Sequence, residues 1–297
     1  MTLTRPRSIE EMIRRDENFV TDESFTRGLG YVPDPTDVFI SPYAKCGTTW
    51  MQQIVHGLRT GGSMAFDEIT EVVPWLELAH DMGWDVNDDQ VARPRAFKSH
   101  LRWDEIPKGG RYIVVLRDPV DAMVSLFRFL EGWRFEAGAV SIEDFGDYYI
   151  ERPDSDGYWG HLSSWWRERH REEILLLSFE GMKADLPATV GRVADFIGVP
   201  EDPDLRAVAT RQASFDFMKA RGRQFDDHLQ RAFRDKACGL PPDGVATKVS
   251  TGQVGAGKPL VNKELRAKFD ARWQEVMGAE FGLESYADLL KALDEKF

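Results

Sequence analysis

The chain reads Ser41-Pro-Tyr-Ala-Lys-Cys-Gly-Thr-Thr-Trp50 between the short apolar run Val38-Phe-Ile40 and a segment with helical spacing, Met51 to Leu58. A strand that turns through a loop of small residues into a helix directs several free backbone N–H groups at one point. That point also lies at the positive end of the helix dipole. Within the segment, one lysine adds a cation and two threonines add hydroxyl donors. The segment therefore predicts a cradle for a phosphate or sulfate group.

The residue order in this cradle differs from that of the common nucleoside-triphosphate loop. That loop runs G-x-x-x-x-G-K-[ST], with its lysine directly after the last glycine. Here Lys45 precedes Gly47 by two residues, and no glycine stands near Ser41. The alternative is a plain strand-to-helix turn, in which Gly47 only allows tight packing.

Expected strands and helices alternate along the chain. We expect strands near Val38 and at 95–99, 111–116 and 172–179. Helices are expected at 9–19, 51–58, 119–130, 141–150, 157–171, 188–197, 204–211, 215–220 and 262–277, and loops at 28–35 and 239–259. Alternation of this kind is typical of a parallel sheet covered on both faces. We therefore predict an α/β fold: a single three-layer domain over residues 1–297, with a central, mostly parallel sheet and helices on both faces.

Composition limits the classes of function. The net charge is −12, from 38 basic and 50 acidic residues, which disfavours a nucleic-acid binder because phosphate contacts need a basic face. The apolar runs are too short for a membrane span, and the first residues lack the apolar core of a signal peptide. Two cysteines in 297 residues favour a reducing compartment, so we expect a cytoplasmic protein.

A second anion site is expected where the 111–116 strand ends. Arg117 and Asp118 follow that strand, and Ser125 lies eight residues beyond Arg117, about two helical turns along the next helix. Ligands of open α/β sheets gather at this edge, where an arginine can hold a phosphate with two donors. Two alternatives remain: Arg117 pairs only with Asp118 or Asp121, or Asp118 binds Mg²⁺ as in P-loop kinases.

A histidine ends the preceding expected strand in Phe97-Lys-Ser-His-Leu101. Histidine titrates near neutral pH and can take a proton from an attacking hydroxyl. His100 is one of six histidines, so its position at the ligand-bearing edge is what selects it. A hydrogen bond from a strand-end histidine to a neighbouring loop is the simpler alternative.

These motifs together resemble those of the cytosolic-type sulfotransferases, from about Val38 to Lys258. Lys45-Cys-Gly-Thr-Thr-Trp50 is similar to the family's 5′-phosphosulfate loop, Lys-Ser-Gly-Thr-Thr-Trp. Leu116 to Ser125 resembles its 3′-phosphate motif, and Lys98-Ser-His-Leu101 its Lys-Thr-His-Leu segment.

The resemblance implies a co-substrate, 3′-phosphoadenosine 5′-phosphosulfate (PAPS), a product, adenosine 3′,5′-bisphosphate (PAP), and no catalytic metal. By match, His100 is the general base, and Lys45 and Lys98 stabilise charge. The matched co-substrate-binding residues are Lys45, Cys46, Gly47, Thr48, Thr49, Trp50, Arg117, Ser125, Phe179, Phe215, Thr251 and Gly252.

The chain departs from the family pattern at several positions. Phe179 replaces a tyrosine and Ala213 a threonine on the adenine side. The family's Arg-Lys-Gly loop over the 3′-phosphate is matched by residues 250–252, Ser-Thr-Gly, which lack both cations. Lys248 or Arg223 is a candidate to compensate for them, and the alternative is that PAPS binds more weakly. The family's dimer signature is not recognisable, so the oligomeric state stays open.

Cys46 stands where the family commonly has serine, and we expect it to be a small packing residue. The alternative is a thiol whose pKa is lowered by Lys45 and the helix start, so that oxidation would block the site.

The expected acceptor is a small apolar alcohol, phenol or amine, because such pockets are mostly apolar. Trp84, Phe135 and Trp159 are the aromatic residues expected in loops around it. Two rival functions remain: a P-loop kinase using Mg-ATP, and a nucleotide-binding module with weakened catalysis.

Overall fold

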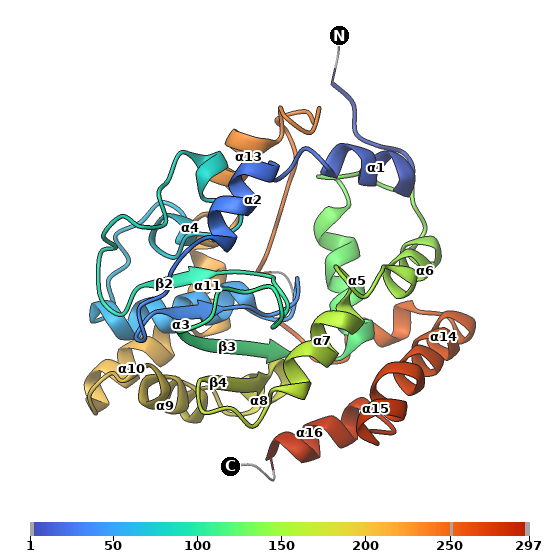
Figure 1. Ribbon diagram of the computed structural model, residues 1–297. Helices are drawn as coiled ribbons and strands as arrows, with labels where there is room; N and C mark the ends of the chain where they lie inside the picture. Colours follow the sequence, from blue (N-terminus) through green and yellow to red (C-terminus); the bar gives the residue numbers. More distant parts are fainter. Residues whose placement is uncertain (1–2, 250–251, 295–297) are drawn as a thin grey trace.

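The computed structural model describes residues 3–249 and 252–294, and its centre is a parallel sheet (Figure 1). The strands are β1 (Val38–Ile40), β2 (Ala96–Lys98), β3 (Arg111–Leu116) and β4 (Ile174–Ser178). Their order is β2-β1-β3-β4, and each neighbouring pair is parallel. The α/β class and the four expected strands are therefore confirmed, and every pairing in this sheet is parallel.

Sixteen α-helices are present in the described residues. They are α1 (Ile9–Asp16), α2 (Asp22–Leu29), α3 (Thr48–Thr60), α4 (Ile69–Val72), α5 (Pro119–Leu130), α6 (Ile142–Glu151), α7 (Tyr158–Arg167), α8 (Phe179–Ala184), α9 (Leu186–Ile197), α10 (Pro203–Gln212), α11 (Phe215–Ala220), α12 (Gly222–Phe225), α13 (His228–Arg234), α14 (Lys263–Trp273), α15 (Ala279–Phe281) and α16 (Tyr286–Asp294). Short 3₁₀ turns lie at His80–Met82 and Lys258–Leu260, and a π-helical turn lies at Gln274–Gly278. None of the described helices is long and apolar enough to cross a membrane.

Helices cover both faces of the sheet, which is why the strand residues are mostly apolar and buried, with the polar residues Arg111, Lys98 and Ser178 at strand ends. Helices α3, α9 and α10 pack on one face against side chains such as Val38 and Val115 (Figure 1). Helices α5, α6, α7, α14 and α16 contribute to the core on the other face, against Phe39 and Tyr112. The result is the predicted arrangement of three layers.

Local sequence signals set several helix ends. Ser8 caps α1 by accepting a hydrogen bond from Glu11 N at 3.2 Å. Asp118 caps α5, accepting from Val120 N and Asp121 N, and Pro119 takes the first helical position, where its missing N–H costs nothing. Since α5 starts directly after β3, its first turns lie at the carboxyl edge of the sheet.

Helix α2 lies partly where we predicted a loop, so this prediction was wrong in that part. Thr21 caps the helix, and Gly28 lies within it. A Cβ atom on Gly28 would come within 2.5 Å of Leu76 O. Gly28 therefore allows a close helix contact and does not form a turn, a distinction that its position in the sequence does not reveal.

Candidate active site

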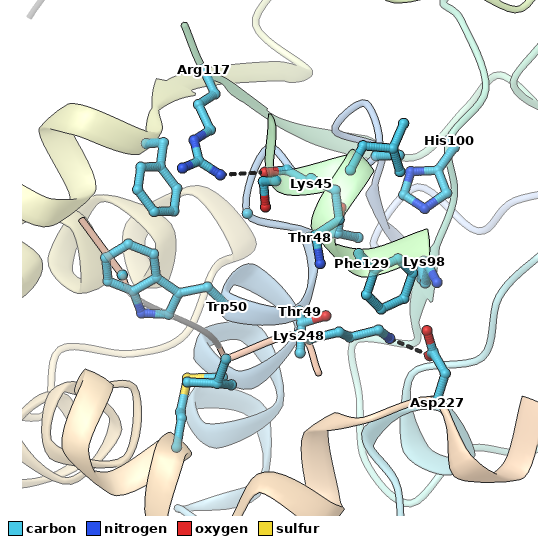
Figure 2. A pocket seen from close by; sticks show the side chains of 18 of the residues that line it. Lys45, Thr48, Thr49, Trp50, Lys98, His100, Arg117, Phe129, Asp227 and Lys248 are labelled. Carbon is cyan, nitrogen blue, oxygen red and sulfur yellow. Dashed lines mark hydrogen bonds and ion pairs between the residues drawn. The ribbon is translucent and has the colours of Figure 1, made fainter. Parts of the chain in front are cut away.

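One cavity of about 420 Å³ opens at the carboxyl edge of the strands. It brings together residues that the sequence selected one motif at a time (Figure 2). Its lining includes the predicted residues Lys45, Gly47, Thr48, Thr49, Trp50, Lys98, His100, Arg117, Ser125, Phe179, Phe215 and Gly252. Of the other two predicted residues, Thr251 lies outside the described residues, and Cys46 is absent from the lining.

The cradle loop has an unusual backbone. Gly47 caps α3 with φ +112°, and Lys45 has φ +67°, a left-handed conformation that lysine rarely adopts. Such a conformation persists only where the surroundings hold it, and it is concentrated at functional sites. The Thr48 hydroxyl is buried without a hydrogen-bond partner in the described part of the chain. The loop thus offers unused donors at the positive end of α3.

Arg117 links this cradle to the end of β3. Its Nη1 donates to Lys45 O at 2.9 Å, and its guanidinium lies 4.3 Å from the Phe179 ring centroid. Its Nε is buried and has no partner among the residues that the structure describes. Ser125 lines the same cavity further along α5. Arg117 and Ser125 therefore line the same cavity, and Arg117 has an unused donor there.

Aromatic side chains flank the cavity near Arg117. The Trp50 ring lies 5.5 Å from that of Phe179, and Trp50 Nε1 donates to Ala213 O at 2.7 Å. Gly252 packs so closely on Phe215 that a Cβ atom there would come within 2.6 Å of the ring. Trp50, Phe179 and Phe215 therefore give this cavity part of its aromatic lining.

His100 is held in one orientation. Its Nδ1 lies 2.7 Å from Pro42 O, and its backbone N donates to Glu77 Oε1 at 2.9 Å. A carbonyl oxygen only accepts, so Nδ1 carries the proton and Nε2 keeps its lone pair. Burial, followed by the charge of Lys98, holds the pKa of His100 well below its ordinary value. The imidazole is therefore neutral at neutral pH, as a proton acceptor must be.

Two lysines face the cavity from aromatic surroundings. Lys45 Nζ lies 3.9 Å from the Phe129 ring centroid, and Lys98 Nζ lies 3.8 Å from that of Trp75. Burial, and then repulsion from Lys248, lower the pKa of each lysine to about 7. An anion bound between them would raise both pKa values and hold both lysines charged.

The apolar wall differs from our expectation. Phe135 and Trp159 are fully buried in the core, and Trp84 packs against the same core, so none of the three lines the cavity. Trp159 lies in α7, which agrees with the helix expected at 157–171 and not with its selection as a loop residue of the acceptor pocket. The aromatic residues that line this part of the cavity are Phe19, Trp75, Phe129 and Trp133. No sequence signal separates them from core aromatics, because packing and ligand contact use the same side chains.

Asp118 has structural partners for both carboxylate oxygens. Oδ1 caps α5, and Oδ2 lies 3.1 Å from Lys258 Nζ. Asp121 accepts from Gly255 N and Gly257 N and ties that loop to α5. Asp118 and Asp121 therefore bond to other groups, which does not favour the alternative that Arg117 serves only as their ion-pair partner.

The two candidate compensating cations lie in different surroundings. Arg223 is 69% exposed, pairs with Asp67 at 3.0 Å and is absent from the cavity lining. Lys248 lines the cavity and forms an ion pair with Asp227. Asp227 is a lining residue that the sequence gave no reason to select, because no motif surrounds it.

Cys46 is expected to resist alkylation and oxidation in the native protein. It is 1% exposed, and burial raises the pKa of its thiol to about 12, the opposite of the shift expected from its place near a helix start. Labelling by iodoacetamide at pH 8, followed by mass spectrometry, should be about 10³-fold slower than in urea-unfolded protein. Labelling of the native protein at the rate of a free thiol would contradict this.

Comparison with known proteins identifies the relatives of this chain. Residues 35–281 match a family model described as the sulfotransferase domain. Luciferin sulfotransferase of Photinus pyralis is 26% identical over 88% of this chain and 77% of its own length. Sulfotransferase 2A1 of Homo sapiens is 28% identical over 69% of this chain and 70% of its own length.

Solved structures share the fold. Mouse sulfotransferase SULT7A1, complexed with PAP, gives a TM-score of 0.69 at 18% identity, covering 94% of this chain and 95% of its own. Retinol dehydratase, in a complex with retinol and PAP, gives 0.68 at 17% identity, covering 92% of this chain and 96% of its own.

Proposed function

The chain belongs to the sulfotransferase domain family, and on that premise we propose that it transfers a sulfuryl group from PAPS to a hydroxyl or amine of an apolar small molecule, with His100 as the general base. The family assigns sulfuryl transfer. The contents of the cavity support the proposed acceptor class and the proposed roles of individual residues.

The cavity fits PAPS because it offers unused donors at two separate points. The Thr48 hydroxyl and Arg117 Nε are buried without partners among the described residues. A 5′-phosphate in the cradle and a 3′-phosphate at Arg117 and Ser125 would supply acceptors for both donors. These two orphaned donors in one cavity are the observation that carries the proposal.

The aromatic side chains that line the cavity near Arg117 suit adenine. Trp50, Phe179 and Phe215 present ring faces or edges, and stacking on such faces is favourable for any base. Phe179 has no hydroxyl with which to bond the base. We therefore propose that packing, more than hydrogen bonding, holds the adenine.

PAPS, when bound, supplies the sulfuryl group, and the chain supplies the proton acceptor and the positive charge. His100 Nε2 takes the proton of the acceptor hydroxyl while the acceptor oxygen bonds to sulfur. Lys45 and Lys98 stabilise the negative charge that develops on the 5′-phosphate oxygen as its bond to sulfur breaks.

The acceptor side is apolar and aromatic, which supports a flat or elongated apolar alcohol or phenol. The Trp75 ring lies 5.2 Å from the His100 ring, and Phe19 lies 5.8 Å from Trp75 and 6.4 Å from Trp133. The wall thus begins beside the proposed base. The similar fold of retinol dehydratase, solved with the apolar alcohol retinol, supports the same acceptor class.

PAP is expected to stabilise the protein against heat, and Arg117→Ala is expected to remove most of this effect. A ligand at about 100 times its Kd adds roughly 2.7 kcal/mol to the free energy of unfolding. For a chain of this length, that corresponds to a rise in Tm of about 4 °C. Differential scanning fluorimetry with PAP, and separately with ATP and Mg²⁺, measures both responses.

The two rival functions give different results in this experiment. Stabilisation by ATP with Mg²⁺ and not by PAP would contradict the proposal and favour a P-loop kinase. Stabilisation by PAP without transfer to any acceptor would favour a binding module with weakened catalysis. The exposed variant Arg223→Ala serves as the control and should respond to PAP like the wild type.

A further inference from the structure

A carboxylate lies inside a cavity that is otherwise suited to an anionic ligand. Asp227, at the start of α13, is 3% exposed and lines the cavity. Burial alone would raise the pKa of Asp227, but the charges of Lys248, Lys98 and Lys45 outweigh burial and leave the pKa below its ordinary value. A negative charge in this place needs an explanation, because it repels the sulfuryl group and phosphates that the cavity is proposed to bind.

The ion pair between Asp227 and Lys248 explains why a carboxylate lies in this cavity. The Lys248 side chain is 9% exposed, and its Nζ points to Asp227 beside Lys98, while Arg117 lies on the opposite side of the view (Figure 2). The charge of Lys248 also lowers the pKa of Lys45, Lys98 and His100. Lys248 is therefore close to the groups proposed to act on the sulfuryl group.

We propose that Lys248 is a third cation for the transferred sulfuryl group and that Asp227 is the positioning residue that orients the Lys248 side chain. This inference rests on the proposed function. During transfer, the acceptor oxygen bonds to sulfur and its proton passes to His100 Nε2. The sulfur–oxygen bond to the 5′-phosphate breaks and leaves its electron pair on that oxygen. Lys248 adds positive charge beside Lys45 and Lys98 for this step.

The negative charge of Asp227 allows a third charged lysine, Lys248, in the same cavity as Lys45 and Lys98. Three ammonium groups in one buried space repel each other, and burial already favours their neutral forms. Asp227 raises the pKa of Lys45 and of Lys98, opposing that loss of charge. It also holds the flexible Lys248 side chain within reach. When an anion enters the cavity, Lys248 can share its donors between this anion and Asp227, because an ammonium has three.

The test compares Lys248→Met with Lys248→Arg, Asp227→Asn and the wild type. We measure the Kd of PAP and of PAPS by calorimetry, and kcat by PAP release with 2-naphthol as a phenol probe. Lys248→Met is expected to lower kcat about 10–100-fold and to lose affinity for PAPS relative to PAP, which lacks the sulfuryl group. Its Kd for PAP should change little. Lys248→Arg should restore much of the loss, because it keeps the charge.

Asp227→Asn gives a readout that a purely structural ion pair would not. Without this carboxylate, Lys45 and Lys98 lose their protons at lower pH, so the alkaline limb of the kcat profile should move to lower pH. Lys236→Met, at an exposed lysine near α13, is the matched control and should behave like the wild type.

Three results would overturn the inference while leaving the proposed function intact. The first is a Lys248→Met enzyme with wild-type kcat and wild-type preference for PAPS. The second is a PAP Kd raised about tenfold at unchanged kcat, which would make Lys248 a ligand of the 3′-phosphate. The third is an equal loss of kcat in Lys248→Met and Lys248→Arg together with a lowered Tm, which would mean that the ion pair only stabilises the fold. A wild-type protein that binds neither PAP nor PAPS would instead contradict the proposed function.

Discussion

His100→Ala is expected to lower kcat by about 10²–10⁴-fold, the usual contribution of a positioned general base. The bond from Nδ1 to Pro42 O fixes the tautomer, so Nε2 is the atom that accepts the proton of the acceptor. Binding of PAP should change little, because PAP lacks the sulfuryl group and His100 Nε2 is proposed to act on the acceptor. Steady-state kinetics with PAPS and a phenol, together with calorimetry with PAP, separate the two effects.

The pH dependence of kcat gives a second check on His100. Since the pKa of His100 lies well below its ordinary value, the base stays neutral and active as the pH falls through 6.5. An acid limb with a midpoint at or above 6.5, removed in His100→Ala, would contradict the surroundings that the structure gives this residue. His170→Ala changes an exposed histidine and should keep wild-type kinetics.

Lys45→Met is expected to lower kcat by about 10²–10³-fold, comparable to removing one donor that stabilises charge in a transition state. The side chain of methionine keeps most of the packing against Phe129 and removes the charge. The affinity for PAP should also fall, because Lys45 lies in the cradle proposed to hold the 5′-phosphate. Lys263→Met, at an exposed position, is the matched control.

The pKa of Lys45 also predicts how the affinity for PAP depends on pH. The pKa of Lys45 is about 7 without ligand, and a bound phosphate raises it. Below pH 7 the lysine is already charged, whereas above pH 7 binding must take up a proton. The wild-type affinity should therefore fall as the pH rises from 7 to 9, and Lys45→Met should flatten this dependence. A pH-independent Kd in the wild type would contradict the shifted pKa.

The residues that the sequence placed correctly in the cavity follow strands or begin helices. Lys45, His100 and Arg117 each come directly after a strand, or one loop later, and the carboxyl ends of parallel strands meet at one edge. Knowing that the sheet is parallel is therefore enough to bring these side chains together. Ser125 was predictable for a related reason, because helical geometry fixes its distance from the start of α5.

The acceptor wall and the Asp227–Lys248 pair were not predictable in this way. Phe19 and Trp133 reach the cavity from segments whose positions depend on how α1 and α5 pack, which no local pattern encodes. Asp227 precedes a short helix that we did not predict, and its pairing with Lys248 is a long-range contact. Long-range contacts between irregular segments leave no periodic signal in a single sequence.

The position of β1 within the sheet also sets the order in which the site is completed as the chain is synthesised. β1 is the first strand in sequence, but it lies between β2 and β3, so its backbone has no partner until residues 96–98 have been made and is not paired on both sides until residues 111–113 have been made. Such non-local pairing is slow, because a long loop must close before any contact forms. The cradle sequence therefore leaves the ribosome well before it has a sheet to hold it. The cavity lacks Asp227, Lys248 and Gly252 until most of the chain is available, so a fragment that ends after α5 would contain both anion-binding motifs without a complete site.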